Sequence, residues 1–273
     1  QTCALPIFLG LDTQADMVEA YNRNAVGDVQ VGDSDDNIAI SIDTLGTKRR
    51  GRLTIVKSGA DYGGGATGVE ELFADGVGKK TNFHADLVKW EPPLDDDGDP
   101  IGEGFEARDV RIRIQGTSSV NYPYKNIRIY LTTPFNKTNG CTLKIGDVSY
   151  TYDAASGKLK DGQGNTCQGY CLRGEDSRPQ TVLCAKTDFV DSSLTLNTGG
   201  AHLFNDAMER LGLRTPPMAH DSRVRQAIDG IPCDMFVSTG ENETPTYFGQ
   251  FVLNNEKSKS GKIFGMEGND ASV

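Results

Sequence analysis

Apolar and polar residues alternate along residues 109–132 in a way that predicts two neighbouring β-strands. Ile112 and Ile114 alternate with polar residues in the first half of this stretch, and Ile127 and Ile129 do so in the second half. A polar segment that contains glycine and proline separates the two halves. Because alternation with a period of two is typical of strands that bury one face, the stretch predicts an antiparallel hairpin.

Shorter runs of the same kind predict further strands on both sides of the hairpin. They cover residues 36–43, 53–56, 142–145, 148–152, 223–228, 233–237 and 247–253. Asn-Gly, Asp-Gly and Gly-Gly steps recur along the chain, and such steps favour tight turns between strands. We therefore expect many strands and few helices.

One amphipathic helix is predicted over residues 198–212. Gly212 suits its carboxyl end, and Pro216 blocks its continuation. The apolar residues at helical spacing are Leu203, Phe204, Ala207, Met208 and Leu211. We expect this face to pack on the sheet. The sequence thus predicts an α+β domain with a mainly antiparallel sheet and one principal packed helix.

The pattern divides the chain into three parts. Residues 1–7 resemble the translation of a short-read sequencing adapter, so we expect them to be non-native and set them aside. Residues 8–58 predict a β-rich region, which is either a small module or the first strands of the main domain. Residues 59–273 predict the main domain, and we expect it to be truncated at its carboxyl end.

The charge and the hydropathy of the chain argue against two classes of partner. Among its 273 residues, 38 are acidic and 28 are basic, and the resulting net charge of −10 would repel a nucleic-acid backbone. No apolar run approaches the roughly 18 residues that a membrane-spanning helix needs. We therefore expect neither nucleic-acid binding nor a membrane span.

The cysteine and acidic residues lack the spacing of known metal sites. Three residues separate Cys167 from Cys171, and paired CxxC knuckles are absent from the sequence. His202 is interpreted as a surface or hydrogen-bonded histidine rather than a metal ligand. The acidic run at 95–99 does not fit the register of a calcium-binding EF-hand loop. We expect reduced thiols or a single disulfide bridge, and no metal site.

The polar face of the predicted hairpin is cationic. Arg111, Arg113, Lys125 and Arg128 would lie close together on neighbouring strands, beside a turn that carries hydroxyl groups. One interpretation is an anion-binding site. The other is that these cations form ion pairs with acidic neighbours, and residue chemistry alone favours this second interpretation.

The hairpin also carries a run of residues found in a known family. Its segments RIQGTSS at 113–119 and YPYKNIR at 122–128 resemble the signature of the spore-coat protein CotH family, whose members are atypical protein-kinase-like proteins. Segments similar to other parts of that family lie at 189–193, 228–236 and 247–257. A narrower resemblance is to divergent CotH-like proteins of gut bacteria and their tailed phages.

The resemblance implies an ATP site with magnesium at the hairpin. Lys125 would contact phosphate, and Glu256 would be its ion-pair partner or would orient it. The residues implied to bind the nucleotide are Lys125, Arg128, Arg113, Ser118, Ser119 and Glu256. Two residues depart from the family signature, because Gln115 and Tyr124 stand where it has Arg and Lys.

Two functions are consistent with the resemblance. The first is an atypical kinase that transfers phosphate from ATP to Ser or Thr of a coat or surface protein. The second is a non-enzymatic structural module of a phage virion, a phage tail or a bacterial cell surface. Only Glu267 and Asp270 follow Glu256 as acidic residues. We therefore expect the chain as given to lack the magnesium-holding half of a kinase and to be inactive in transfer.

A third and weaker interpretation is a binding module for surface glycans. It would use exposed aromatic residues such as Trp90, Tyr122 and Tyr124. Packing of these rings in the core or at its rim explains them more simply.

Overall fold

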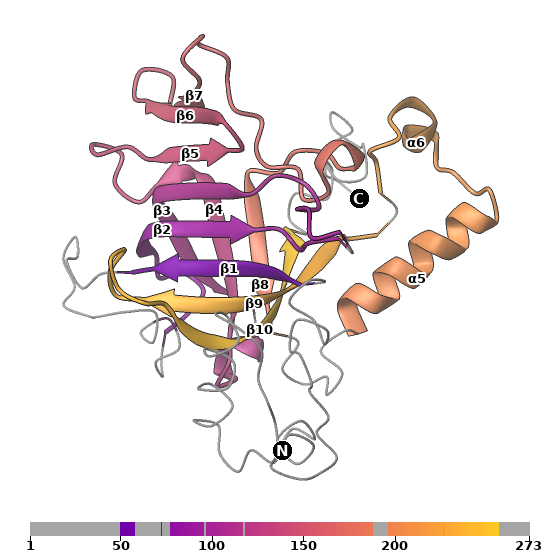
Figure 1. Cartoon of the computed structure of the whole chain (residues 1–273), viewed down its shortest axis with the longest axis horizontal. Helices are drawn as coiled ribbons and strands as arrows, with labels where there is room; N and C mark the ends of the chain where they lie inside the picture. Colours follow the sequence, from indigo (N-terminus) through magenta and orange to yellow (C-terminus); the bar gives the residue numbers. More distant parts are fainter. Residues whose placement is uncertain are drawn as a thin grey trace.

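The described residues form one mixed, largely antiparallel sheet of ten strands (Figure 1). The computed structural model describes residues 50–57, 72, 77–95, 97–116, 118–187, 196–225 and 227–256. The strands are β1 (Gly51–Val56), β2 (Phe83–Glu91), β3 (Phe105–Gln115), β4 (Asn126–Pro134), β5 (Thr142–Ile145), β6 (Val148–Asp153), β7 (Lys158–Lys160), β8 (Val182–Lys186), β9 (Gly230–Ser238) and β10 (Thr246–Asn255). The helical elements are η2 (Ser118–Asn121), η3 (Gly174–Asp176), α5 (Leu196–Arg210) and α6 (Pro216–His220).

Seven of the strands close into a ring. The order is β2-β1-β9-β10-β8-β4-β3, and β3 also pairs with β2. Every pairing in the ring is antiparallel except that of β1 with β9, which is parallel. Because the ring is closed, each of these strands is hydrogen-bonded to a neighbouring strand on both edges along part of its length. From the outer part of β3, the strands β5, β6 and β7 continue the sheet away from the ring.

The predicted hairpin at 109–132 is confirmed. β3 and β4 pair antiparallel, with Ile112 opposite Ile129 and Ile114 opposite Ile127. All four side chains are buried in the main hydrophobic core. The alternation in the sequence therefore identified the strands, their pairing and the face that each strand buries. The intervening turn contains the short helix η2.

The core lies inside the ring, where inward-facing side chains from different strands meet. The inward residues of the central strands are Leu53, Ile55, Val88, Trp90, Leu183, Ala185, Met235 and Leu253, and all are buried. Trp90 is only 1% exposed, so it does not present a surface ring for a glycan. Gly51 makes room for this indole, because a Cβ atom at that position would lie 2.0 Å from Cη2 of Trp90.

β3 changes its pairing strand at a break in the strand register. Its first half pairs with β5 and its second half with β4, and the β4 register shifts between Val110 and Arg111. At this point Asp109 has a positive φ of 57°, a conformation that costs energy for most residues but that Asp tolerates better than most. Its carboxylate oxygen lies 3.0 Å from Nε2 of His84, and its carbonyl accepts a hydrogen bond from the amide of Phe135. These contacts hold the bend.

The structure contradicts one of the predicted strands. The strand expected at 223–228 is absent from its described residues, where the chain turns instead. The carboxylate of Asp221 accepts hydrogen bonds from both the backbone amide and the guanidinium of Arg223, and this local contact competes with extended pairing.

The strand expected at 36–43 and the adapter-like residues 1–7 lie outside the described residues. Of the region 8–58, residues 51–56 are described as β1, which belongs to the main sheet.

The prediction that the helix packs its apolar face on the sheet is wrong. A helix is present as α5, but Leu203 is 72% exposed, Leu211 is 70% exposed and Phe204 is 48% exposed. Figure 1 shows α5 standing at one side of the sheet, with one end near β9. Helical spacing of apolar residues predicts a helix, but it does not determine what that face contacts. The label α+β therefore applies only loosely to a fold that is mostly β.

Replacing Leu203 with alanine is expected to change the free energy of unfolding by less than about 0.5 kcal/mol. The side chain is exposed, and alanine is the best helix former. The matched control is Leu183→Ala in β8, whose fully buried side chain should cost about 2–5 kcal/mol. Denaturant melts of both variants check the pair, and a similar loss in both would contradict the exposed position of α5.

The cysteines of the described part are free thiols. Cys141, Cys167, Cys171, Cys184 and Cys233 are all unpaired, as one of the two sequence-based alternatives predicted. Burial, with a smaller contribution from the charge of Asp109, raises the pKa of Cys141 to about 12. Burial likewise raises the pKa of Cys184 and Cys233.

None of the described helices is long and apolar enough to cross a membrane.

Candidate functional site: a cationic face on β3, β4 and β8

The register of the ring aligns polar residues from four strands in one row. Arg113 of β3 stands opposite Arg128 of β4, Arg128 opposite Cys184 of β8, and Cys184 opposite Asn254 of β10. Directly paired residues point to the same side of a sheet. Because the neighbouring row, which includes Ile127, points into the core, this row points to the outside of the ring.

Three arginines of this outer face surround the ring of Tyr130. The guanidinium carbon of Arg111 lies 4.1 Å from the ring centroid, and that of Arg113 lies 5.1 Å from it. Nη1 of Arg128 lies 3.5 Å from the hydroxyl oxygen. Stacking on an aromatic ring holds a guanidinium in place without neutralising it. Lys186 of β8 follows Cys184 by two residues and so lies on the same side of the sheet. We call Arg111, Arg113, Arg128, Tyr130 and Lys186 the cationic face.

A buried carboxylate lies next to this face. Glu256 is only 1% exposed, and it forms an ion pair with Nε of Arg128. Nε2 of Gln115 lies 3.2 and 3.3 Å from its two oxygens, and the thiol of Cys184 donates to it at 3.2 Å. Side chains from β3, β4 and β8 therefore fix one carboxylate that follows β10. A buried charge needs such partners, because removing it from water costs on the order of several kcal/mol.

The same contacts change the acid–base properties of the groups involved. Burial acts to lower the pKa of Arg128, but the hydrogen bond to Tyr130 and the charge of Glu256 outweigh it and raise that pKa. Burial raises the pKa of the Cys184 thiol, and the charge of Glu256 raises it further. Arg128 therefore keeps its positive charge, and Cys184 stays a neutral hydrogen-bond donor at neutral pH.

The charges of the cationic face do not cancel within the described residues. Arg128 is paired with Glu256, whereas the structure gives Arg111, Arg113 and Lys186 no carboxylate partner in the part of the chain that it describes. Among the described residues, ion pairing with an acidic neighbour thus accounts for only one of the three arginines. This is an arrangement that can bind a phosphate or carboxylate group through charge-assisted hydrogen bonds.

The structure brings three of the six predicted site residues together, namely Arg113, Arg128 and Glu256. Lys125 lies one residue before β4 and is only 3% exposed. Ser118 and Ser119 lie in η2, and their side chains are outside the described residues. Glu256 forms an ion pair with Arg128. The family resemblance implied that Glu256 pairs with Lys125 or orients it, and that role stays a prediction.

Sequence reasoning missed Tyr130, Cys184 and Lys186 as members of this region. The signal for Tyr130 was present, since it alternates with Ile129 in the same strand. β8 carries a weaker signal because its sequence VLCAK is almost wholly apolar and four of its five residues are buried. A strand buried on both faces shows no alternation that would reveal which side Cys184 and Lys186 occupy.

The described residues include no group of three or more His, Cys, Asp or Glu side chains that could hold a metal ion. Glu267 and Asp270, the acidic residues that follow Glu256, lie outside the described residues. Comparison of the chain with known protein families, with curated proteins and with solved structures found no match. The class that the fold itself defines is a mostly β protein with a closed ring of strands and an outward cationic face.

Proposed function

We propose that the cationic face binds a phosphate-bearing ligand, and that the chain is part of a CotH-like atypical protein kinase. The ligand would be ATP with magnesium. In the full-length protein the phosphate would pass to a Ser or Thr of a coat or surface protein. The observation that supports this most strongly is that Arg111 and Arg113 stack on Tyr130 without a carboxylate partner among the described residues.

The geometry gives each residue a role in binding. A guanidinium offers a planar fork of N–H donors that matches the oxygens of a phosphate. The Arg128–Glu256 ion pair fixes one such group, so that Arg128 loses little conformational entropy when a ligand binds. Phosphoryl transfer depends mainly on positioning and on stabilisation of charge, which a fixed set of cations supplies in part. Magnesium, when bound with the nucleotide, would neutralise phosphate charge.

Replacing Arg113 with alanine is expected to weaken the binding of Mg-ATP by about 10- to 100-fold, because one charged hydrogen-bonding group is worth roughly 1.5–3 kcal/mol. The control is Arg108→Ala on the same strand, whose guanidinium already donates to Glu241 at 2.6 Å. This variant should bind as the unchanged chain does. Titration calorimetry measures all three proteins.

Lys125→Ala extends the same experiment to the residue that the family resemblance favours. Weakened binding in this variant would support a contact between Lys125 and phosphate. Incubation with labelled ATP and an added Ser- and Thr-rich protein then tests transfer separately from binding. Incorporation of label that is lost in Lys125→Ala would support the kinase, whereas binding without incorporation would support a nucleotide-binding module. Equal affinity of Arg113→Ala and the unchanged chain would refute the site.

The second candidate is a non-enzymatic structural module of a phage virion, a phage tail or a bacterial cell surface. One observation favours it: Arg128, Gln115 and Cys184 are already engaged with Glu256, so this cluster stabilises the strand arrangement without any ligand. Under this alternative the chain shows no binding of Mg-ATP. Substitution of Glu256 then affects only the stability of the fold.

A further inference from the structure

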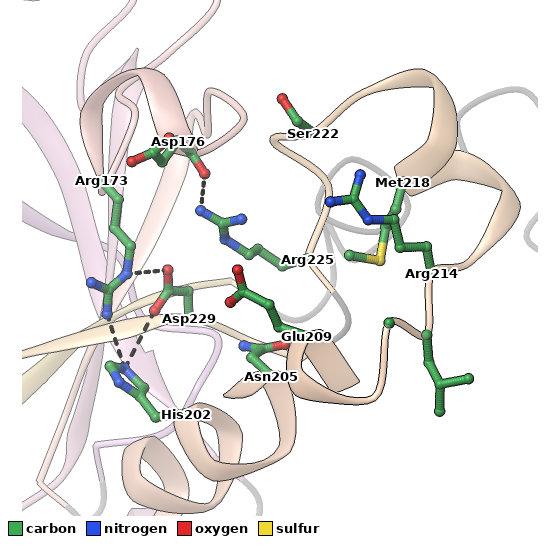
Figure 2. Close-up of a pocket in the computed structure, with 12 residues that line it drawn as sticks. Arg173, Asp176, His202, Asn205, Glu209, Arg214, Met218, Ser222, Arg225 and Asp229 are labelled. Carbon is green, nitrogen blue, oxygen red and sulfur yellow. Dashed lines mark hydrogen bonds and ion pairs between the residues drawn. The ribbon is translucent and has the colours of Figure 1, made fainter. Parts of the chain in front are cut away.

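A second polar site lies away from the cationic face. It is a cavity of about 530 Å³ between α5, the segment around α6 and the residues that precede β9 (Figure 2). Cavities of roughly 300–1,000 Å³ are typical of small-molecule sites. Its charged lining includes Arg173, Glu209, Arg214, Arg225 and Asp229, and His202 lies among them.

One side of the cavity is a fixed hydrogen-bonded group. Asp229 is buried, forms an ion pair with Nε of Arg173 and accepts a hydrogen bond from the amide of Gly230 at 2.9 Å. Nη2 of Arg173 lies 2.9 Å from Nε2 of His202. Nε2 of His202 also lies 3.4 Å from the carbonyl oxygen of Gly230 and 3.6 Å from Oδ1 of Asp229. The charges of Arg173 and Asp229 therefore offset each other.

The other side presents charged groups that are not paired with one another. Nη2 of Arg225 donates to the backbone carbonyl of Asp176, which leaves the charge of Arg225 without a carboxylate partner in the described part of the chain. There, too, the structure gives the side chains of Glu209 and Arg214 no hydrogen bond or ion pair. Figure 2 shows the guanidinium groups of Arg214 and Arg225 and the carboxylate of Glu209 turned toward the same space.

We propose that this cavity binds a zwitterionic amino acid with an apolar side chain. The carboxylate of the ligand would meet Arg225 and Arg214, whose planar N–H groups match its two oxygens. The ammonium group would meet Glu209. The lining carries three arginines and three carboxylates, the third being Asp176, so it favours a ligand with both charges over a polyanion. Leu213 and Met218 supply apolar contacts for the ligand's side chain.

Titration of the isotope-labelled chain with L-leucine, followed by heteronuclear NMR, tests this site. Leucine is expected to shift the signals of residues around the cavity. Leucinol, which lacks the carboxylate, and 4-methylpentanoate, which lacks the ammonium, should each bind at least about tenfold more weakly. If both analogues bind as leucine does, or if leucine at millimolar concentration shifts no cavity signal, the proposal is overturned.

Variants then assign the two ends of the ligand. Arg225→Ala is expected to weaken leucine binding by about tenfold or more, and Glu209→Gln to weaken leucine but leave 4-methylpentanoate unchanged. Arg210→Ala is the matched control, because Arg210 is exposed on α5, the helix that carries Glu209, and does not line the cavity. Thermal melts confirm that each variant is folded. Equal weakening of leucine by Arg210→Ala and Arg225→Ala would overturn the assignment.

Discussion

Replacing Glu256 with alanine is expected to lower the free energy of unfolding by about 3–5 kcal/mol, the usual effect of removing one member of a buried ion pair. The carboxylate is almost fully buried, and it is the charged partner of Arg128. Its loss leaves the guanidinium partly buried beside Gln115 and Cys184, which cannot replace a negative charge. Denaturant unfolding measures the change.

The matched control is Glu241→Ala. Glu241 also accepts from an arginine, with Nη1 of Arg108 at 2.6 Å, but both side chains are substantially exposed. An exposed pair of this kind contributes about 0–1 kcal/mol. The double variant Arg128→Met, Glu256→Leu should recover part of the lost stability, because no unpaired charge remains. Equal small losses at Glu256 and Glu241 would show that the buried pair contributes no more than a surface pair.

Replacing Gly51 with alanine is expected to cost about 3 kcal/mol, at the upper end of the range for overpacked cores. The added Cβ atom would lie 2.0 Å from Cη2 of Trp90 and 2.6 Å from two further ring carbons. Trp90 is enclosed by the strand ring and is 1% exposed, so its rigid indole cannot move aside without disturbing the core. Thermal and denaturant melts check the loss.

Two comparisons isolate the collision as the cause. Gly162→Ala is the matched control, because a Cβ atom at Gly162 would meet nothing within 4 Å. In a Trp90→Phe background the colliding six-membered part of the indole is absent, so Gly51→Ala should cost much less there than in the unchanged chain. The same cost in both backgrounds would mean that another feature of β1 requires glycine.

The sequence predicted the parts of the fold whose signal is local. Ile112, Ile114, Ile127 and Ile129 define one buried face by simple alternation, and the structure pairs them as expected. The helix at α5 was also correctly located by its spacing. Its environment was not, because the exposure of Leu203 depends on which other elements reach that face, and the spacing within one helix carries no such information.

In the candidate site, too, the sequence predicted only the contacts between residues that are close together in the chain. Arg113 and Arg128 could be placed on one face because they belong to a single hairpin. The pairing of Glu256 with Arg128 depends on β10 lying beside β8 and β8 beside β4, a strand order that skips along the chain. Glu256 follows Asn254 by two residues and so lies on the same outward face of the sheet as Arg128. Only the complete strand order reveals this alignment.

The parallel pairing of β1 with β9 has a consequence for the way this chain is made. β1 lies at residues 51–56, yet one of its two neighbours is the strand at 230–238, which the ribosome synthesises much later. Until β9 and β10 have emerged, β1 and β8 each lack one partner, and the inner face of the ring stays open to water. Contacts between such distant segments are slow to form. The nascent chain is therefore expected to depend on chaperones until β9 and β10 are in place.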